Sequence, residues 1–161
     1  MPGVSESEPV PTLAEWAGGL EALERLTSVF YAKVPADPVL SPVFAHMGGD
    51  HAAHVAGFIA EVFGGPKAWS DGGESHASMI ARHLNRHLTE VQRRRWIDLM
   101  RDSLDEAGLP DDPEFRAAVV GYLEWGTRLA VINSAEGVPE PSPGMPMPSW
   151  DWGPPGGPWR G

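Results

Sequence analysis

The chain has 161 residues, enough for one domain with a substantial core, and it contains no cysteine. Its 22 acidic residues outnumber its 12 basic residues, and the resulting net charge of −10 argues against non-specific binding to nucleic acid or to an anionic membrane. Without cysteine the chain has no thiolate ligand for a metal, so any metal cofactor would have to be held by histidine.

No segment approaches the roughly 18 continuous apolar residues that a membrane-spanning helix needs. Residues 1–11 are acidic and contain proline, which is unlike a secretory signal, and we expect them to form a flexible lead-in. These features predict a soluble, cytoplasmic protein.

The first helical region runs from Thr12 to Pro35. Apolar residues recur there at three- and four-residue spacing, and Gly18-Gly19 divides the region into two helical pieces. Pro38 and Pro42 then predict a bent connection without a long helix.

A second helix is predicted to follow Asp50, a residue suited to the N-cap position, and to stop at Gly64-Gly65-Pro66. Its predicted buried residues are Val55, Phe58, Ile59 and Val62. A polar, glycine-rich stretch from Lys67 to Ser75 and a short helix leading into His83 complete this part of the chain.

Two longer helices end the regular pattern. Thr89 and Gln92 form a capping box for the first, and Asp112-Pro113 starts the second. The predicted inward residues are Trp96, Ile97, Met100 and Leu104 on the first helix, and Phe115, Val119, Tyr122, Leu123, Leu129 and Ile132 on the second.

The composition changes after Gly137. Residues 138–161 contain eight prolines, five glycines and three tryptophans, so we expect a disordered or polyproline-like tail outside the core, dispensable for the fold. Trp150, Trp152 and Trp159 are costly to leave exposed, which favours docking on the domain or a partner over a plain spacer. The predicted organisation is therefore a lead-in (1–11), one domain (12–137) and a tail (138–161).

Histidines carry the candidate chemistry, but their spacing alone leaves several interpretations open. His83 and His87 are four residues apart, as in a helical zinc site, yet the capping box at Thr89 speaks against one helix through both. His51 and His54 lie three apart on another predicted helix. The two remaining histidines, His46 and His76, are expected to be solvated in loops. On their own, Tyr31 and Trp96 are equally well explained as large core residues.

Several motifs in a specific order suggest a family. They are Gly18-Gly19, Phe30-Tyr31, Asp37-Pro38-Val39-Leu40, Phe44, Phe63-Gly64-Gly65-Pro66, Ala81-Arg82-His83, Trp96, Asp105-Glu106-Ala107-Gly108-Leu109-Pro110 and Tyr122-Leu123-Glu124. In this order and spacing the chain resembles the second group of the truncated haemoglobins, from Leu13 to Ser134.

The resemblance implies an all-α fold, a shortened globin in which two crossed helix pairs sandwich haem b. It implies that His83 is the proximal iron ligand, and that Tyr31, Trp96 and His51 donate hydrogen bonds to a bound gas. Arg82 is the candidate for a haem propionate. The other haem contacts implied are Phe44, Val55, Phe58, Met79 and Trp96.

Three features depart from the family pattern. Asn85 and Arg86 replace a proline and a phenylalanine common after the proximal histidine, which predicts a more polar proximal edge. His51 replaces a small residue, so it is expected to gate ligand entry, bond to the ligand or bind the iron itself. Residues 69–77 also differ in composition, and their alignment is left open.

The function implied is reversible binding of oxygen or another diatomic gas, by a monomer or homodimer, rather than enzymatic turnover. One alternative is a haem-based NO dioxygenase or peroxidase that depends on an external reductase, since no flavin or nicotinamide site is recognisable. A second alternative is a sensor or partner-binding module that acts through the proline- and tryptophan-rich tail.

Overall fold

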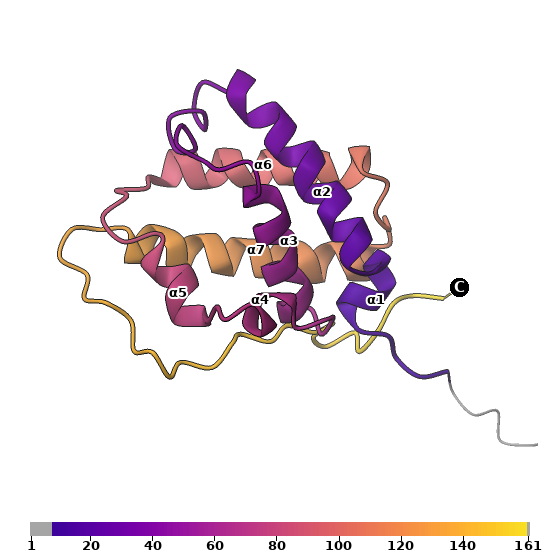
Figure 1. Ribbon diagram of the computed structural model, residues 1–161. Coiled ribbons are helices and arrows are strands. Elements are labelled where there is room, and N and C mark those ends of the chain that lie inside the picture. Colours follow the sequence, from indigo (N-terminus) through magenta and orange to yellow (C-terminus); the bar gives the residue numbers. More distant parts are fainter. Residues whose placement is uncertain (1–7, 161) are drawn as a thin grey trace, which may run out of the picture.

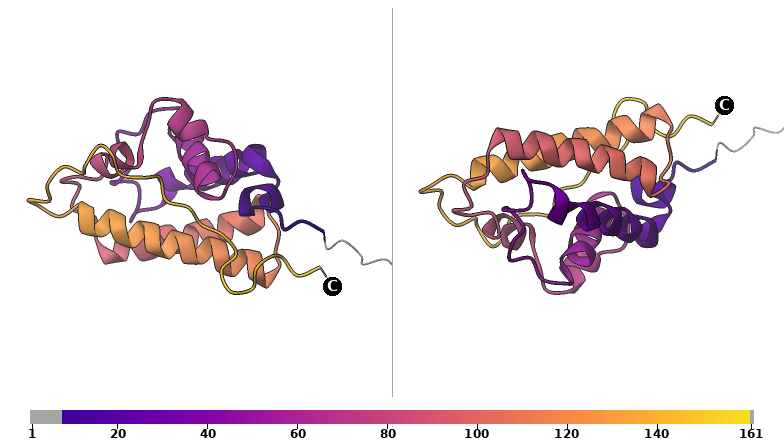
Figure 2. Two further views of the ribbon diagram at one scale, coloured as in Figure 1. Left: turned by 90° about the horizontal axis from the view of Figure 1, so that it is seen from below. Right: turned by 90° about the horizontal axis from the view of Figure 1, so that it is seen from above.

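Two crossed pairs of helices form the body of the computed structural model, which describes residues 8–160 (Figure 1). Helices α2 (Gly19–Lys33) and α3 (His51–Val62) make one pair, and α6 (Glu90–Glu106) and α7 (Pro113–Asn133) make the other. Figure 2 shows the pairs as two stacked layers. All regular elements of the described residues are helical, which confirms the predicted two-over-two helical fold.

Four short elements connect these helices. Helix α1 (Leu13–Ala17) precedes α2, and the 3₁₀ helix η1 (Val34–Ala36) follows it. Helices α4 (Ala68–Asp71) and α5 (His76–Ala81) lie between α3 and α6. Within residues 8–160 no helix is long and apolar enough to cross a bilayer.

Local sequence signals explain most helix boundaries. Gly18 has a φ of 110°, a left-handed conformation that ends α1 and turns the chain into α2. The Thr89 side chain accepts a hydrogen bond from the amide of Gln92, whose own side chain accepts one from the Thr89 amide, so the predicted capping box is confirmed. Asp112 caps α7 by accepting from the Phe115 amide.

The prediction at Asp50 is only half right. Asp50 immediately precedes α3, but its side chain caps no amide and instead lies 3.5 Å from the ring of His54. The contact with His54 draws the carboxylate away from the helix end, and α3 begins without a side-chain cap.

The stretch from Lys67 to Ser75, predicted to be a polar loop, contains helix α4. Its Trp69 is 3% exposed and donates an indole hydrogen bond of 2.9 Å to the Ser75 carbonyl. One buried aromatic ring therefore anchors a segment whose average composition is polar.

The core fills the space between the two layers. Its largest fully buried side chains are Phe30, Phe63, Phe115, Leu13, Leu23, Leu26, Leu40, Met100 and Leu104. The predicted inward positions of α6 and the first half of α7 are confirmed, but Ile132 is wrong because it is 55% exposed. Its neighbours Ala130 and Val131 line the cavity between the layers, so Ile132 lies on a different face of α7, which is turned to solvent.

An ion pair between the buried Asp37 carboxylate and the partly exposed Arg95 side chain fixes the connection after η1. The Asp37 carboxylate accepts hydrogen bonds of 3.0 Å from the amides of Val39 and Leu40 and is paired at 2.5 Å with Arg95 of α6. Burial alone would raise the pKa of Asp37, but these hydrogen bonds outweigh it and hold the pKa below its ordinary value.

The tail runs back across the molecule past α5 and α4 and reaches α1 (Figure 1). Trp150 is bonded to both layers, through its amide to the Val62 carbonyl and through its indole to the Ala118 carbonyl, each at 2.9 Å. Trp152 is 6% exposed and belongs to the core, with its indole bonded to the Pro11 carbonyl at 2.8 Å. The expectation that the tail lies outside the core is therefore wrong at Trp152. The preference for docking over a plain spacer is confirmed at Trp150 and Trp152 but not at Trp159, which is 69% exposed.

Candidate functional site

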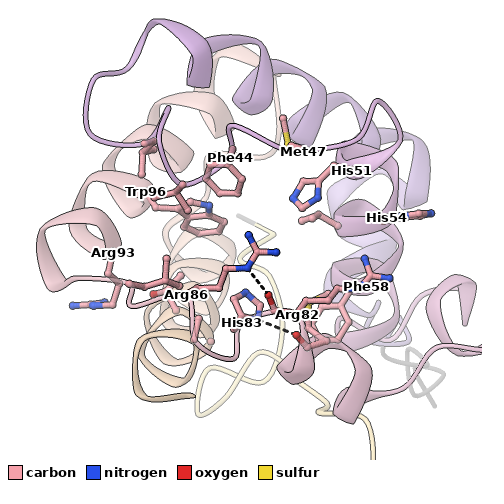
Figure 3. Close-up of a pocket in the computed structure, with 18 of the residues that line it drawn as sticks. Phe44, Met47, His51, His54, Phe58, Arg82, His83, Arg86, Arg93 and Trp96 are labelled. Atoms are coloured by element: carbon pink, nitrogen blue, oxygen red, sulfur yellow. Dashed lines mark hydrogen bonds between the residues drawn. The ribbon is translucent and has the colours of Figure 1, made fainter. Parts of the chain in front are cut away.

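A cavity of about 500 Å³ opens between the two helix layers (Figure 3). It receives side chains from α2, α3, α5, α6 and α7 and from the connections between them. Every residue that the sequence analysis assigned to the site lines it, namely Tyr31, Phe44, His51, Val55, Phe58, Met79, Arg82, His83 and Trp96. Residues up to 65 positions apart along the chain, such as Tyr31 and Trp96, are thus brought to one place.

His83 projects from the turn that follows α5 rather than from a helix, since α5 ends at Ala81. Its Nδ1 lies 2.9 Å from the Met79 carbonyl oxygen. Because a carbonyl only accepts, Nδ1 must carry the proton, and Nε2 keeps its lone pair free for a metal. Burial lowers the pKa of His83 against the opposing effect of the Met79 bond, so the ring is held in the neutral form that ligates metals.

His51 lies across the cavity from His83 (Figure 3) and forms a hydrogen-bonded pair with Tyr31. His51 Nε2 lies 3.1 Å from the Tyr31 hydroxyl, and the two rings meet edge to face with centroids 4.9 Å apart. Burial raises the pKa of Tyr31 and lowers that of His51, so both groups are neutral near pH 7. A small ligand between this pair and His83 would face a hydroxyl donor.

Aromatic rings form the flank of the cavity. Phe30 packs against both Tyr31 and Trp96, with centroids 4.8 and 5.3 Å apart, and Phe44 packs against Tyr31 at 5.4 Å. Among residues 8–160 no hydrogen-bond acceptor meets the indole N–H of Trp96, which stays free to donate. This wall offers a flat apolar surface with one additional donor.

Arginines supply positive charge on the His83 side of the cavity. Arg82 already pairs with Glu74 at 3.0 Å and lies over the Trp69 ring at 5.0 Å. Arg86 also lines the cavity, and within residues 8–160 its side chain makes a single hydrogen bond, of 3.1 Å to the Arg82 carbonyl. The sequence marks Arg86 as a departure from the family pattern but does not predict it as a ligand-binding residue. Its guanidinium makes fewer contacts than that of Arg82, which is paired with Glu74 and stacked on Trp69.

Arg93 lines the cavity too, but carboxylates hold it in place. Its guanidinium, 7% exposed, bonds Glu90 and Glu124, each at 2.6 Å. The bond from Arg93 lowers the pKa of Glu90 to about 2. Arg93 therefore contributes to the wall rather than to binding an anion.

The other histidines behave differently from one another. His54 reaches the rim of the cavity, but its ring points away from the cavity (Figure 3), with Nε2 3.5 Å from an Asp50 carboxylate oxygen. His46 also lines the mouth. His76 was expected in a solvated loop, but it opens α5 and stacks on Phe58, with centroids 6.5 Å apart. His87 is exposed with a φ of 53°, and no group of three metal-binding acidic or histidine side chains forms among residues 8–160.

One face of α7 completes the cavity and was not foreseen. Tyr122 and Leu123 were predicted to be inward, but only as core, and the remaining lining residues of this helix are Gly126, Thr127, Ala130 and Val131. Small residues at four-residue spacing, Gly126 and Ala130, were the available signal, because they leave room beside a helix.

The residues present fit a haem group. The cavity volume is within the range of about 300–1,000 Å³ typical of cofactor sites, and its walls are aromatic and aliphatic. His83 presents a free Nε2 from one side, and Arg82 and Arg86 are suited to the two propionates. His51 also lines the cavity, but its Nε2 is already engaged with the Tyr31 hydroxyl at 3.1 Å.

Comparisons with known proteins agree with this geometry. A family model described as bacterial-like globin matches residues 12–125. The chain is 30% identical over 118 residues to the group 2 truncated hemoglobin YjbI of Bacillus subtilis, covering 73% of this chain and 86% of that protein.

Solved structures give the same result. The group II truncated hemoglobin of Bacillus anthracis has a TM-score of 0.68 and 27% identity, covering 78% of this chain and 93% of that one. A structure described as a truncated oxygen-avid haemoglobin from Bacillus subtilis has a TM-score of 0.66 and 29% identity, covering 75% of this chain.

Proposed function

Because the chain belongs to the bacterial-like truncated globin family, whose members bind haem b, we propose that it binds oxygen reversibly at an iron held by His83. When bound there, haem would supply an iron able to take up a diatomic gas. The observation that carries the proposal is the His83 ring, fixed at Nδ1 by Met79, facing the Tyr31–His51 pair across the cavity.

The distal residues favour oxygen among the diatomic gases. Iron-bound oxygen has partial negative charge, which a nearby O–H or N–H stabilises by about 1.5–3 kcal/mol. Tyr31 and Trp96 supply two such donors from different helices, and His51 supports Tyr31. A relative described as oxygen-avid shares the fold at 29% identity.

A spectrum of the purified protein tests the first part of this proposal. We expect a Soret band, one haem per chain, and a stable oxygenated spectrum after reduction in air. A protein without a Soret band would contradict haem binding. A haem protein that oxidises at once, without an oxygenated form, would contradict oxygen binding while leaving the haem site intact.

Peroxide reduction is a second candidate function. It requires a supply of electrons, and one observation favours it: an aromatic cluster connects the His83 side of the cavity with the surface. The partner-binding alternative loses support, because Trp150 and Trp152 are engaged within the chain and only Trp159 of the tail tryptophans is largely exposed.

A further inference from the structure

Three aromatic rings form a cluster where the tail crosses α7. Trp150 lies 5.6 Å from Tyr122 and 5.7 Å from Trp125, and Tyr122 and Trp125 are 6.2 Å apart, all between ring centroids. The two hydrogen bonds of Trp150, to Val62 and Ala118, fix the ring contributed by the tail. The cluster therefore contains only tryptophan and tyrosine, the two residue types whose aromatic rings are most easily oxidised.

The inner end of this cluster lies at the site. Tyr122 is 5% exposed and lines the large cavity together with His83. A second cavity, of about 60 Å³, is lined by His83, Tyr122 and Trp125 and is covered by Pro148 of the tail. Within residues 8–160 the Tyr122 hydroxyl has no hydrogen-bond partner. Burial raises the pKa of Tyr122, so the hydroxyl stays protonated near neutral pH.

The outer end of the cluster lies at the surface. Trp125 is 40% exposed, although its ring packs against the buried Tyr122 and the half-buried Trp150 and lines the small cavity. A tryptophan needed only for packing gains most from full burial, whereas a ring that exchanges electrons with dissolved molecules needs an accessible edge. The rate of electron transfer falls steeply with distance. Several short steps between neighbouring rings are therefore much faster than one long step from the surface to the cavity.

We propose that Trp125 is the surface electron-entry site of the haem centre, with Tyr122 and Trp150 forming the relay to the His83 side. The inference rests on the proposed haem site and assigns an additional activity, the one-electron oxidation of donors at the surface. Its substrates are hydrogen peroxide inside the cavity and small phenol- or ascorbate-type donors outside, which need not enter the cavity.

The electrons and protons balance over one turnover. Hydrogen peroxide takes up two electrons and two protons and leaves as two molecules of water. Tyr122 gives up the two electrons one at a time toward the cavity. After each step Tyr122 is reduced again by Trp125, either directly or through Trp150. Trp125 regains each from one donor molecule. Two donors therefore lose one electron and one proton each, and these protons replace those consumed by the peroxide.

The site of oxidative damage distinguishes this relay from simple exposure. The haem-loaded protein is treated with limiting hydrogen peroxide without a donor, and oxidised tryptophan is mapped by peptide mass spectrometry. We expect oxygen addition at Trp125, even though Trp159 is more exposed, at 69% against 40%. Tyr122→Phe keeps the packing but removes the inner oxidisable ring, so damage at Trp125 should fall several-fold.

Turnover with a donor gives a second measurement. Trp125→Phe should reduce the peroxide-dependent oxidation of a bulky phenolic donor several-fold, while the matched variant Trp159→Phe leaves it unchanged. Haem content and melting temperature are measured for each variant. Two results obtained with a normal Soret band would overturn the relay alone. One is more oxidation at Trp159 than at Trp125, and the other is equal donor oxidation by Trp125→Phe and Trp159→Phe. A missing Soret band would overturn the haem site and the relay together.

Discussion

Replacing Tyr31 by Phe removes a single hydroxyl from the cavity wall opposite His83 and should accelerate oxygen release. The Tyr31 ring is 8% exposed and packs against Phe30, Phe44 and His51, contacts that Phe retains. The variant therefore tests the hydrogen bond separately from the packing.

The size of the effect follows from a competition for that hydroxyl. Without a ligand it is already bonded to His51 at 3.1 Å, a neutral bond that contributes about 1 kcal/mol. Donation to partly negative oxygen contributes about 1.5–3 kcal/mol. If the Tyr31–His51 bond has to break, the net gain is about 0.5–2 kcal/mol, which corresponds to an increase of about 2- to 30-fold in the dissociation rate of Tyr31→Phe.

Stopped-flow measurement of oxygen release from the wild type and Tyr31→Phe gives this ratio directly. Tyr122→Phe is the matched control, since Tyr122 is an equally buried tyrosine that lines the cavity on the His83 side. Its dissociation rate should stay within about twofold of the wild type. A Tyr31→Phe rate no faster than the control would refute the assignment of Tyr31 as a ligand donor.

Three further predictions test the site and the fold. His83→Ala should lose haem, and added imidazole should restore the Soret band; full haem content in the variant alone would contradict the assignment of His83. Trp152→Ala should lower the free energy of unfolding by about 3–5 kcal/mol, or about 6–20 °C in melting temperature, whereas Trp159→Ala should change it by less than about 0.5 kcal/mol. For Asp37, the folded-state pKa is below the unfolded value of about 3.9, so its stabilising effect is present above that pH and disappears as the pH falls through the folded pKa. The free energies of unfolding of Asp37→Asn and the wild type, measured with urea, should therefore converge as the pH falls from about 5 to about 2. A difference in free energy that does not change with pH would contradict the role of the Asp37–Arg95 pair.

Helix positions were predictable because their signals are local. The capping residues at Thr89 and Asp112 and the glycine at Gly18 act within four residues of the helix end, and the structure contains all three. Asp50 failed for an equally local reason, since His54 competes for the same carboxylate. The site residues were found through the order of the family motifs rather than through any single residue.

Features that depend on distant partners were not predictable. The burial of Trp69 depends on Phe58, whose ring meets it edge to face at 5.5 Å. The docking of Trp152 depends on Trp16 and Phe115, which the sequence separates from it by 136 and 37 positions. The contacts of Trp152 produce no helical or strand-like repeat of apolar residues in the tail. The proline content of the tail, by itself, indicates an extended chain.

The contact between Trp152 and Pro11 also determines the order in which the chain folds. These residues are 141 positions apart, and closing a loop of that length costs about 4 kcal/mol in chain entropy, whereas each helical turn closes over four residues. The four main helices can assemble before that cost is met, and their assembly creates the groove beside α1 and α7 that Trp152 occupies. We therefore expect the tail to dock last during folding and to detach first during unfolding. Hydrogen exchange at the Trp152 indole should consequently report an opening of lower free energy than exchange at the amides of α6.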